Sequence, residues 1–202
     1  MNSITSSVRA VISSIFLLLI SAPAFAHADV ASLQGGFMSG FMHPISGLDH
    51  VVAMVAVGLW GAFLGKPAIW MLPITFPLVM AFGGALGVAG VPIPYVETGV
   101  ALSGVILGLV VLFAMRPPMW VAAVIVGIFA IFHGYAHGVE LPNAANPLIY
   151  SIGFVIATGL LHLAGIAIGE LKRLPLGEMV VRTGGAIISF IGLGFLTHVL
   201  SA

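Results

Sequence analysis

The chain contains no cysteine among its 202 residues. Disulfides, thiolate metal sites and iron–sulfur clusters are therefore excluded. Charge is nearly as scarce, because Asp, Glu, Lys and Arg together make up 6% of the sequence and the formal net charge is zero. With only six basic residues, the chain cannot form a patch that binds nucleic acid. It has no phosphate-binding Gly-x-x-x-x-Gly-Lys-Ser/Thr loop, so it does not hydrolyse nucleotides by itself.

Apolar residues dominate the composition instead. They account for 60% of the chain, and the mean hydropathy is +1.23. A chain of this composition must place most of its length in hydrocarbon. We therefore expect one all-α membrane domain, surrounded by lipid and without a soluble module.

The first 26 residues have the organisation of a secretory signal peptide. One basic residue, Arg9, precedes an apolar run over residues 11–20, and Ala-Phe-Ala at residues 24–26 forms a small-x-small cleavage site. An uncleaved transmembrane helix is the alternative, but the short apolar run favours cleavage. We therefore expect a mature metal-transport domain over residues 27–202, with His27 as its first residue in the periplasm.

Six segments of the mature chain qualify as transmembrane helices, which need about 20 apolar residues each. Their approximate ranges are 44–64, 68–90, 97–115, 118–138, 147–170 and 178–200. Proline recurs in the short breaks between them, because it begins a helix readily and cannot continue one. The stretch 31–42 is too short and glycine-rich to span alone, and it could lie in the interface, re-enter or extend the first helix. The sequence predicts a bundle of about six transmembrane helices.

Basic residues set the orientation of these helices. If the mature N-terminus is periplasmic, all the basic residues of the mature chain fall on the cytoplasmic side: Lys66, Arg116, Lys172, Arg173 and Arg182. This distribution satisfies the positive-inside rule. The signal peptide and the charge bias agree, so we expect a multi-pass protein of the bacterial inner membrane with a periplasmic mature N-terminus.

Residues 133–140 (His-Gly-Tyr-Ala-His-Gly-Val-Glu) form a polar motif at the predicted periplasmic end of the fourth segment. His133 and His137 are four residues apart, and Glu140 follows three residues later. On a helix these three side chains share one stripe and can point at one ion. Packing histidines and a solvated glutamate are the alternative. Lipid penalises ionisable groups, however, which favours a ligand role.

Residues 43–50 (His-Pro-Ile-Ser-Gly-Leu-Asp-His) form a second motif at the periplasmic start of the first segment, on the same membrane face. Pro44 is expected at the first helical position, which leaves His43 in the capping region. His50 is expected to be a metal ligand, with His43 as a further ligand. Asp49 points about 100° away from His50 on a helix, so it is either a ligand or a carboxylate that orients a metal-bound histidine.

Three more residues are candidates along a metal path, each with a structural alternative. Glu97 begins the third segment, where a carboxylate is also favoured by the helix dipole. His162 lies deep in the fifth segment and is either a second stop for an ion or a buried histidine bonded to a neighbouring helix. His27 would pair its imidazole with the free α-amine of the mature chain, or belong to an ordinary disordered terminus.

Imidazole and carboxylate together suit borderline divalent metals, namely nickel, cobalt, copper and zinc. The leading hypothesis is a transporter that captures such an ion at a periplasmic vestibule and passes it inward. The alternatives are a membrane metalloenzyme holding a fixed ion and a metal-binding accessory protein that does not transport. The sequence shows no additional acid–base or nucleophile constellation, which argues against an enzyme.

At these motifs the sequence resembles the HupE/UreJ family. Residues 43–50, followed by Ala-Met at 53–54 and Gly-Leu-Trp at 58–60, are similar to the first signature of that family. Residues 132–140 are similar to the second signature, and His-Leu-Ala-Gly at 162–165 is similar to a shorter third element, His-x-x-Gly. The resemblance covers the whole mature chain in order and spacing.

The resemblance implies a secondary permease or diffusion facilitator with six spans after a signal peptide. The family is associated with nickel uptake into bacteria and, in other members, with cobalt. Some members sit with hydrogenase or urease genes, which implies a functional link to the maturation of those enzymes. The implied substrate is a divalent ion, nickel foremost. Carried over, the metal-handling residues are His43, Asp49, His50, His133, His137 and Glu140.

Overall fold

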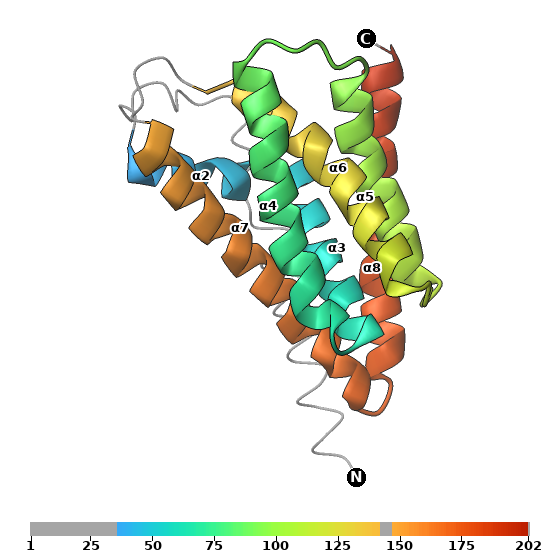
Figure 1. The fold of residues 1–202 in the computed structure, drawn as a ribbon. Coiled ribbons are helices and arrows are strands. Elements are labelled where there is room, and N and C mark those ends of the chain that lie inside the picture. Colours follow the sequence, from blue (N-terminus) through green and yellow to red (C-terminus); the bar gives the residue numbers. More distant parts are fainter. Residues whose placement is uncertain (1–35, 142–146, 202) are drawn as a thin grey trace. The chain divides into compact units, whose positions relative to one another are not determined.

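A computed structural model describes residues 36–141 and 147–201. All regular elements in these two ranges are helical, as the sequence predicts. In chain order they are α2 (Phe37–Ser46), α3 (Leu48–Leu64), α4 (Ala68–Val88), α5 (Val96–Leu112), α6 (Met119–Val139), α7 (Pro147–Gly169), the 3-10 helix η2 (Glu170–Arg173) and α8 (Gly177–Ser201) (Figure 1). The predicted signal peptide and His27 lie outside the described residues.

Proline and glycine mark several helix ends. Pro67 and Pro118 immediately precede α4 and α6, and Pro147 is the first residue of α7. Gly65 ends α3 with a φ of 81°, a left-handed conformation that glycine adopts without steric penalty. Because these signals are local, the predicted segments agree with the helices from α4 to α8 to within a few residues.

Four of the described helices are each long and apolar enough to cross a membrane, namely α4, α6, α7 continued by η2, and α8. A fifth span results if α2 and α3, which are bent by 81° at their junction, cross as one. Helix α5 is apolar but has only 17 residues. The described chain is therefore a multi-pass membrane protein with four or five spans by length and composition, and the predicted count of six is not confirmed.

The first predicted span is divided into α2 and α3, and this division corrects the predicted helix positions of Pro44 and His43. Both residues lie inside α2, so Pro44 is not the first residue of a helix and His43 is not in a capping region. The helix breaks later, at Gly47, where the backbone is extended with φ −85° and ψ 110°. Packing against α7 explains the difference, because Gly40 of α2 lies so close to Tyr150 that a Cβ on the glycine would clash with the carbonyl of Tyr150. Local sequence carries no signal of that contact.

Glycines allow the helices to pack backbone against backbone. A Cβ added to Gly134 of α6 would meet the Met80 carbonyl of α4, and one added to Gly58 of α3 would meet the His162 carbonyl of α7. Gly192 of α8 makes a similar approach to α5. Such close contacts are the usual means of association between helices in lipid, where apolar side chains gain little from mutual burial.

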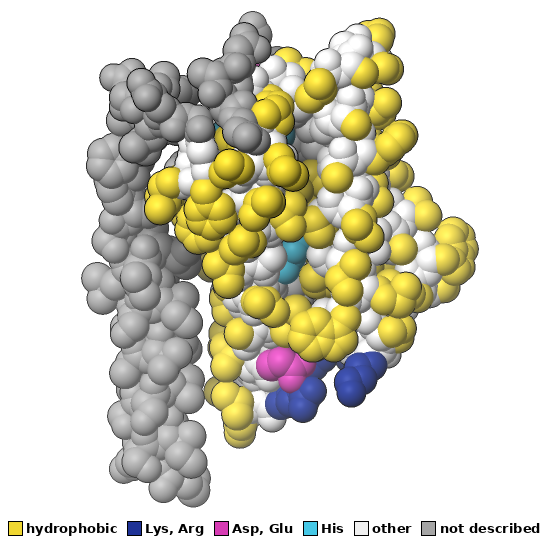
Figure 2. Space-filling view, turned by 60° about the vertical axis from the view of Figure 1, so that its left-hand side comes forward, with side chains coloured by type: hydrophobic (Ala, Val, Ile, Leu, Met, Phe, Trp, Pro, Cys, Tyr) yellow, Lys and Arg dark blue, Asp and Glu magenta, His cyan; other side chains and the backbone are white. Residues whose placement is uncertain are grey.

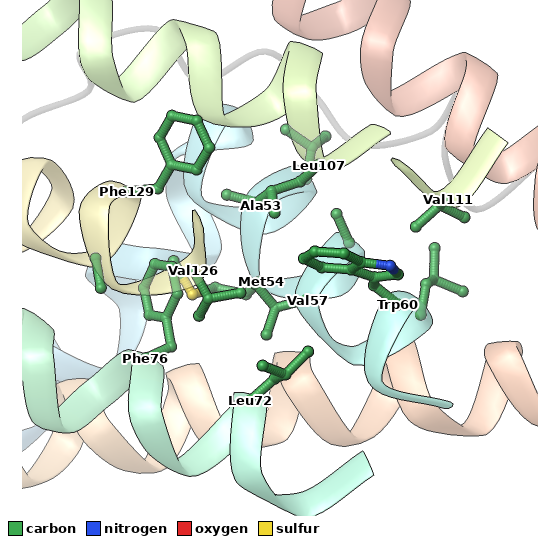
Figure 3. Packing of buried hydrophobic residues seen from close by; sticks show 14 of the residues in the cluster. Ala53, Met54, Val57, Trp60, Leu72, Phe76, Leu107, Val111, Val126 and Phe129 are labelled. Atoms are coloured by element: carbon green, nitrogen blue, oxygen red, sulfur yellow. The ribbon is translucent and has the colours of Figure 1, made fainter. Parts of the chain in front are cut away.

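Helix α3 forms the centre of the packed core. Most of its residues from His50 to Phe63 are buried, and side chains of α4, α5 and α6 cover it. Figure 3 shows this packing through Ala53, Met54, Val57 and Trp60 of α3, Leu72 and Phe76 of α4, Leu107 and Val111 of α5, and Val126 and Phe129 of α6. Helix α3, which begins within the motif at residues 43–50, is thus held on several sides.

The outward faces are apolar, as a lipid-facing surface requires. Trp120 and Phe190, for example, are 70% and 78% exposed. Figure 2 shows hydrophobic side chains over most of the visible face, with Lys and Arg side chains gathered at one end. Arg116 and Lys172 both lie over the ring of Phe63, close to the end of α3. These two basic residues therefore lie at the end of α3 opposite to His50.

Candidate metal site

Three helix ends bring together the two polar motifs, which are far apart in the sequence. His43 comes from the last turn of α2, Asp49 and His50 from the first turn of α3, and His133 and His137 from the last two turns of α6. Glu140 is the residue that caps the end of α6. All six residues predicted as metal-handling groups thus lie in one region of the structure.

His50, His133 and His137 form a three-imidazole cluster. The Nε2 atom of His50 lies 3.0 Å from Nδ1 of His133 and is in close contact with Nε2 of His137. The ring centroids are 4.6 Å apart for His50 and His133 and 4.3 Å apart for His50 and His137. Three ring nitrogens from two helices therefore converge on one point.

Asp49 determines that Nδ1 of the His50 ring carries a hydrogen. Its Oδ2 atom lies 3.1 Å from His50 Nδ1. Because a carboxylate only accepts hydrogen bonds, the Nδ1–H of His50 donates to Asp49, and in the neutral ring the inward Nε2 carries a lone pair. Gly47 makes room for this pair, since a Cβ there would stand 3.0 Å from Asp49 Oδ1 and 3.2 Å from His50 Nδ1. In this geometry Asp49 orients an imidazole, which is one of the two roles expected for it.

Ser103 of α5 fixes the proton of His133 in the same way. Its hydroxyl donates to the carbonyl of Val100 at 2.6 Å and lies 2.9 Å from His133 Nε2. A hydroxyl has one proton, so Ser103 can only accept from His133, whose Nε2 carries the hydrogen. The inward Nδ1 of His133 therefore also carries a lone pair. Both Ser103 and His133 are fully buried.

With all three rings neutral, the cluster presents lone pairs at positions where hydrogen bonds would need a proton. His137 can donate from Nε2 to His50, but the lone pair of His133 then still faces that of His50 across 3.0 Å. A cation between the rings satisfies these nitrogens together. Two nitrogens bound to one transition-metal ion at about 2.1 Å stand roughly 3.0–3.4 Å apart, depending on the coordination angle. This matches the 3.0 Å between His50 Nε2 and His133 Nδ1, whereas the closer contact between His50 and His137 would have to open.

A second group, the outer triad of His43, His137 and Glu140, adjoins the three-imidazole cluster. One potential ligand atom from each of these residues lies within 4.8 Å of the others. His43 Nε2 is 3.9 Å from Glu140 Oε2, and the rings of His43 and His137 are 4.8 Å apart at their centroids. His137 thus belongs to both groups. Its Nδ1 is buried and has no hydrogen-bond partner among the described residues.

The side chain of Glu140 is the most exposed of this triad, and it stands outside the helix that bears the histidines. Partial burial raises the pKa of its carboxyl, and the negative charges of Asp49 and Glu97 act in the same direction, although His50 opposes them. A cation beside Glu140 would favour the ionised form again.

A cavity of about 260 Å³ opens beside the cluster between α4, α6 and α7. Its walls include His137 of α6, Met80 of α4, and Tyr150 and Phe154 of α7. The ring of Phe154 also contacts both His137 and His43, with centroid distances of 4.6 and 6.1 Å. Aromatic and apolar side chains therefore line the approach to His137, while the His43 side chain stays partly exposed.

The remaining sequence candidates that the structure describes, Glu97 and His162, lie elsewhere, and so does the further histidine His198. Glu97 is exposed in the first turn of α5 and influences Glu140 only through its charge. His162 is buried in α7, and its ring meets Phe76, which also contacts His133. His198 is exposed near the end of α8 and makes no contact with the cluster in the described part of the chain.

Sequence reasoning missed Ser103, Phe76 and Phe154 as parts of this region. A lone serine in an apolar helix usually bonds its own backbone, as Ser103 does with Val100, and nothing in its neighbours marks the second bond to His133. The two phenylalanines were indistinguishable from ordinary core residues. Their position on the same helix faces as the histidines becomes visible only in three dimensions.

Imidazoles and carboxylates gathered at one end of an apolar helix bundle define a multi-pass membrane protein with a candidate transition-metal site. The chain belongs to the HupE/UreJ family, since the family described as "HupE / UreJ protein" matches residues 15–195. "Protein HupE" of Rhizobium leguminosarum bv. viciae is 44% identical over 180 residues, which cover 89% of this chain and 94% of that protein. No solved structure matches the chain. The resemblance of the two polar motifs is thereby confirmed.

Proposed function

We propose that this protein is a secondary permease that carries a divalent transition-metal ion, nickel foremost, across the bacterial inner membrane. Its substrate enters from the periplasmic side through the outer triad and the three-imidazole cluster. The mature N-terminus after residue 26 faces the periplasm, and the basic ends of α3 and α5 face the cytoplasm. Metal delivered in this way serves enzymes such as hydrogenase or urease, in keeping with the family's association.

The observation that carries this proposal is the convergence of ring nitrogens of His133 and His137 on His50 Nε2. Buried polar atoms ordinarily pair donor with acceptor. Here Asp49 and Ser103 hold the protons of two rings on their outer sides, so both inward nitrogens carry lone pairs. Neutral imidazoles with inward lone pairs are the form that binds a metal ion, whereas a structural network would need a proton on His50 Nε2.

His137 supplies a physical route between the two groups. An ion held by His43 and Glu140 reaches the three-imidazole cluster by exchanging ligands at a ring that both groups share. Carboxylates of Glu140 and Asp49 offset the positive charge during this step. A carrier must bind its ion tightly enough to admit it and weakly enough to release it.

The donor set limits the metal but does not select one. Imidazole nitrogens with a carboxylate suit nickel, cobalt, copper and zinc, while magnesium and calcium prefer oxygen ligands throughout. Nickel stands first because the family is associated with nickel uptake, and cobalt stands second for the same reason.

Uptake by the purified protein in liposomes tests the proposal. We expect accumulation of radioactive nickel in wild-type vesicles. His137→Ala removes a ring from both groups. Loss of a hydrogen-bond partner of a metal ligand already costs about tenfold or more, so we expect loss of the ligand itself to lower uptake by at least about tenfold. His198→Ala removes an exposed histidine outside the site and serves as the matched control. Normal uptake by a well-folded His137→Ala protein would contradict the assignment.

The same preparation separates a carrier from a protein with a resident ion. Metal content after extensive dialysis is compared with the initial rate of flux. Rapid exchange together with uptake supports the permease. Tight retention of one ion without flux would instead indicate a metal-binding accessory protein or a metalloenzyme.

A further inference from the structure

Two buried polar side chains of α7 have no partner among the described residues. Both ring nitrogens of His162 and the hydroxyl of Thr158 are shielded from solvent and lack any hydrogen bond there. His162 is 1% exposed and Thr158 is 0% exposed. Buried polar groups are almost always paired with protein, ordered water or an ion, so an unpaired histidine and threonine together demand an explanation.

The two side chains lie one above the other on α7. They are four residues apart, so they share one face of the helix and are separated by about 6 Å along its axis. Phe154, a further four residues towards the start of α7, contacts His137 of the three-imidazole cluster. The stripe of Phe154, Thr158 and His162 therefore leads from the candidate metal site into the depth of the bundle.

Phe76 of α4 links the two regions from the other side. Its ring is 5.7 Å from that of His133 and 5.5 Å from that of His162, measured between centroids. All three side chains are fully or almost fully buried. A single aromatic ring thus contacts both the last imidazole of the cluster and the unpaired imidazole below it.

The close packing of α3 and α7 holds His162 in place. A Cβ on Gly58 of α3 would meet the His162 carbonyl, and one on Gly165 of α7 would meet the Val55 carbonyl. The backbone that carries His162 therefore cannot turn the ring towards lipid without separating the two helices. The packing of α3 against α7 therefore keeps the unpaired nitrogens of His162 inside the protein.

We propose that His162 and Thr158 form a second, transient binding station for the same divalent ion, on the cytoplasmic side of the three-imidazole cluster. This inference rests on the proposed function. An imidazole nitrogen and a hydroxyl oxygen are fewer and weaker donors than three imidazoles with carboxylates, so the ion leaves this station more readily than it leaves the cluster. The Phe76 ring lies against an imidazole of each station.

Removal of each donor by a residue of similar shape tests the station. His162→Leu and Thr158→Val delete the polar atoms and keep most of the volume, whereas Thr158→Ser keeps the hydroxyl and serves as the matched control. We expect nickel flux per folded molecule to fall by at least about tenfold in His162→Leu, by less in Thr158→Val, and to stay near wild type in Thr158→Ser. Nickel affinity at the three-imidazole cluster should remain unchanged in all three variants.

Thermal stability distinguishes a station from a structural histidine. Because neither side chain has a hydrogen bond to lose, His162→Leu and Thr158→Val should melt at the wild-type temperature or above it. A lower melting temperature with unchanged flux per folded molecule would overturn the proposal and make His162 a structural residue. Lost cluster affinity in a stable His162→Leu protein would overturn it too, because His162 would then belong to the first site.

A binding measurement keeps this test independent of transport. Equilibrium dialysis of the full chain against saturating cobalt should give one ion fewer per chain in His162→Leu than in the wild type. If wild-type vesicles failed to take up nickel, the permease would be refuted, while the cobalt count would still decide the station. Equal cobalt counts in the two proteins would overturn the station even if uptake were normal.

Discussion

Ser103→Ala tests the proton arrangement on which the candidate site depends. The Ser103 hydroxyl is fully buried, donates to Val100 at 2.6 Å and accepts from His133 Nε2 at 2.9 Å. Alanine removes that acceptor and leaves the His133 Nε2–H without a partner. The neutral ring then places its proton on Nδ1 instead, where it donates to His50 Nε2 at 3.0 Å.

This change affects metal binding and stability differently. In the variant, an incoming ion must displace the proton from the very nitrogen that it needs. Loss of a hydrogen-bond partner of a metal-bound histidine typically weakens affinity about 10–100-fold, which corresponds to about 1.4–2.8 kcal/mol. The metal-free protein gains a bond inside the cluster in exchange for the one it loses, so its stability should change by no more than about 1 kcal/mol.

Calorimetric titration with nickel and thermal melting of the metal-free protein measure the two effects. Ser189→Ala is the matched control, because its hydroxyl donates to the Val105 carbonyl at 3.1 Å and has no contact with an imidazole. We expect weaker binding in Ser103→Ala and wild-type binding in Ser189→Ala. Unchanged nickel affinity in a folded Ser103→Ala protein would refute the assignment of protons in the cluster.

Three further predictions concern pH, packing and processing. Uptake should weaken as pH falls through about 6.5, because protons compete for imidazole nitrogens. Partial burial also raises the pKa of Glu140, so this carboxylate loses its charge at a higher pH than an exposed one. A pH-independent initial rate of nickel flux would contradict this prediction. Gly134→Ala places a Cβ against the α4 backbone and should destabilise the protein by about 1–3 kcal/mol in a melting experiment, whereas Gly159→Ala, with open space around it, should change stability by no more than about 1 kcal/mol. Mass spectrometry of the mature protein should give His27 as the first residue, and any other N-terminus would remove the chelating pair expected there.

Much of the fold could be predicted because its signals are local. Apolar runs bounded by prolines gave the positions of α4, α6 and α8, since a helix in lipid needs a fixed length and a defined end. The convergence of the two histidine motifs also follows from sequence, because the direction of successive spans places both at one membrane face. The metal roles of those residues stay predictions until binding is measured.

The division between α2 and α3 could not be predicted for a physical reason. Two different helix starts satisfy the local preferences of residues 37–50, and contact with α7 chooses between them. The bond between Ser103 and His133 was hidden in the same way, because its partners are 30 residues apart and lie on different helices. Contacts of this kind depend on the packing of the bundle, which periodicity alone does not encode.

The directions of the helices at the site have an electrostatic consequence of their own. Helices α2 and α6 both end there, and the C-terminus of a helix carries about half a negative elementary charge from its aligned peptide dipoles. Helices α3 and α7 begin near the site with the opposite sign, and Asp49 lies in the first turn of α3. The dipoles of these four helix ends therefore largely cancel, and the carboxylates of Asp49 and Glu140 supply the charge that attracts any cation, magnesium as readily as nickel. Discrimination between metals therefore has to come from the imidazole nitrogens, and substitutions that keep the charge but remove a ring should broaden the range of ions bound rather than abolish binding.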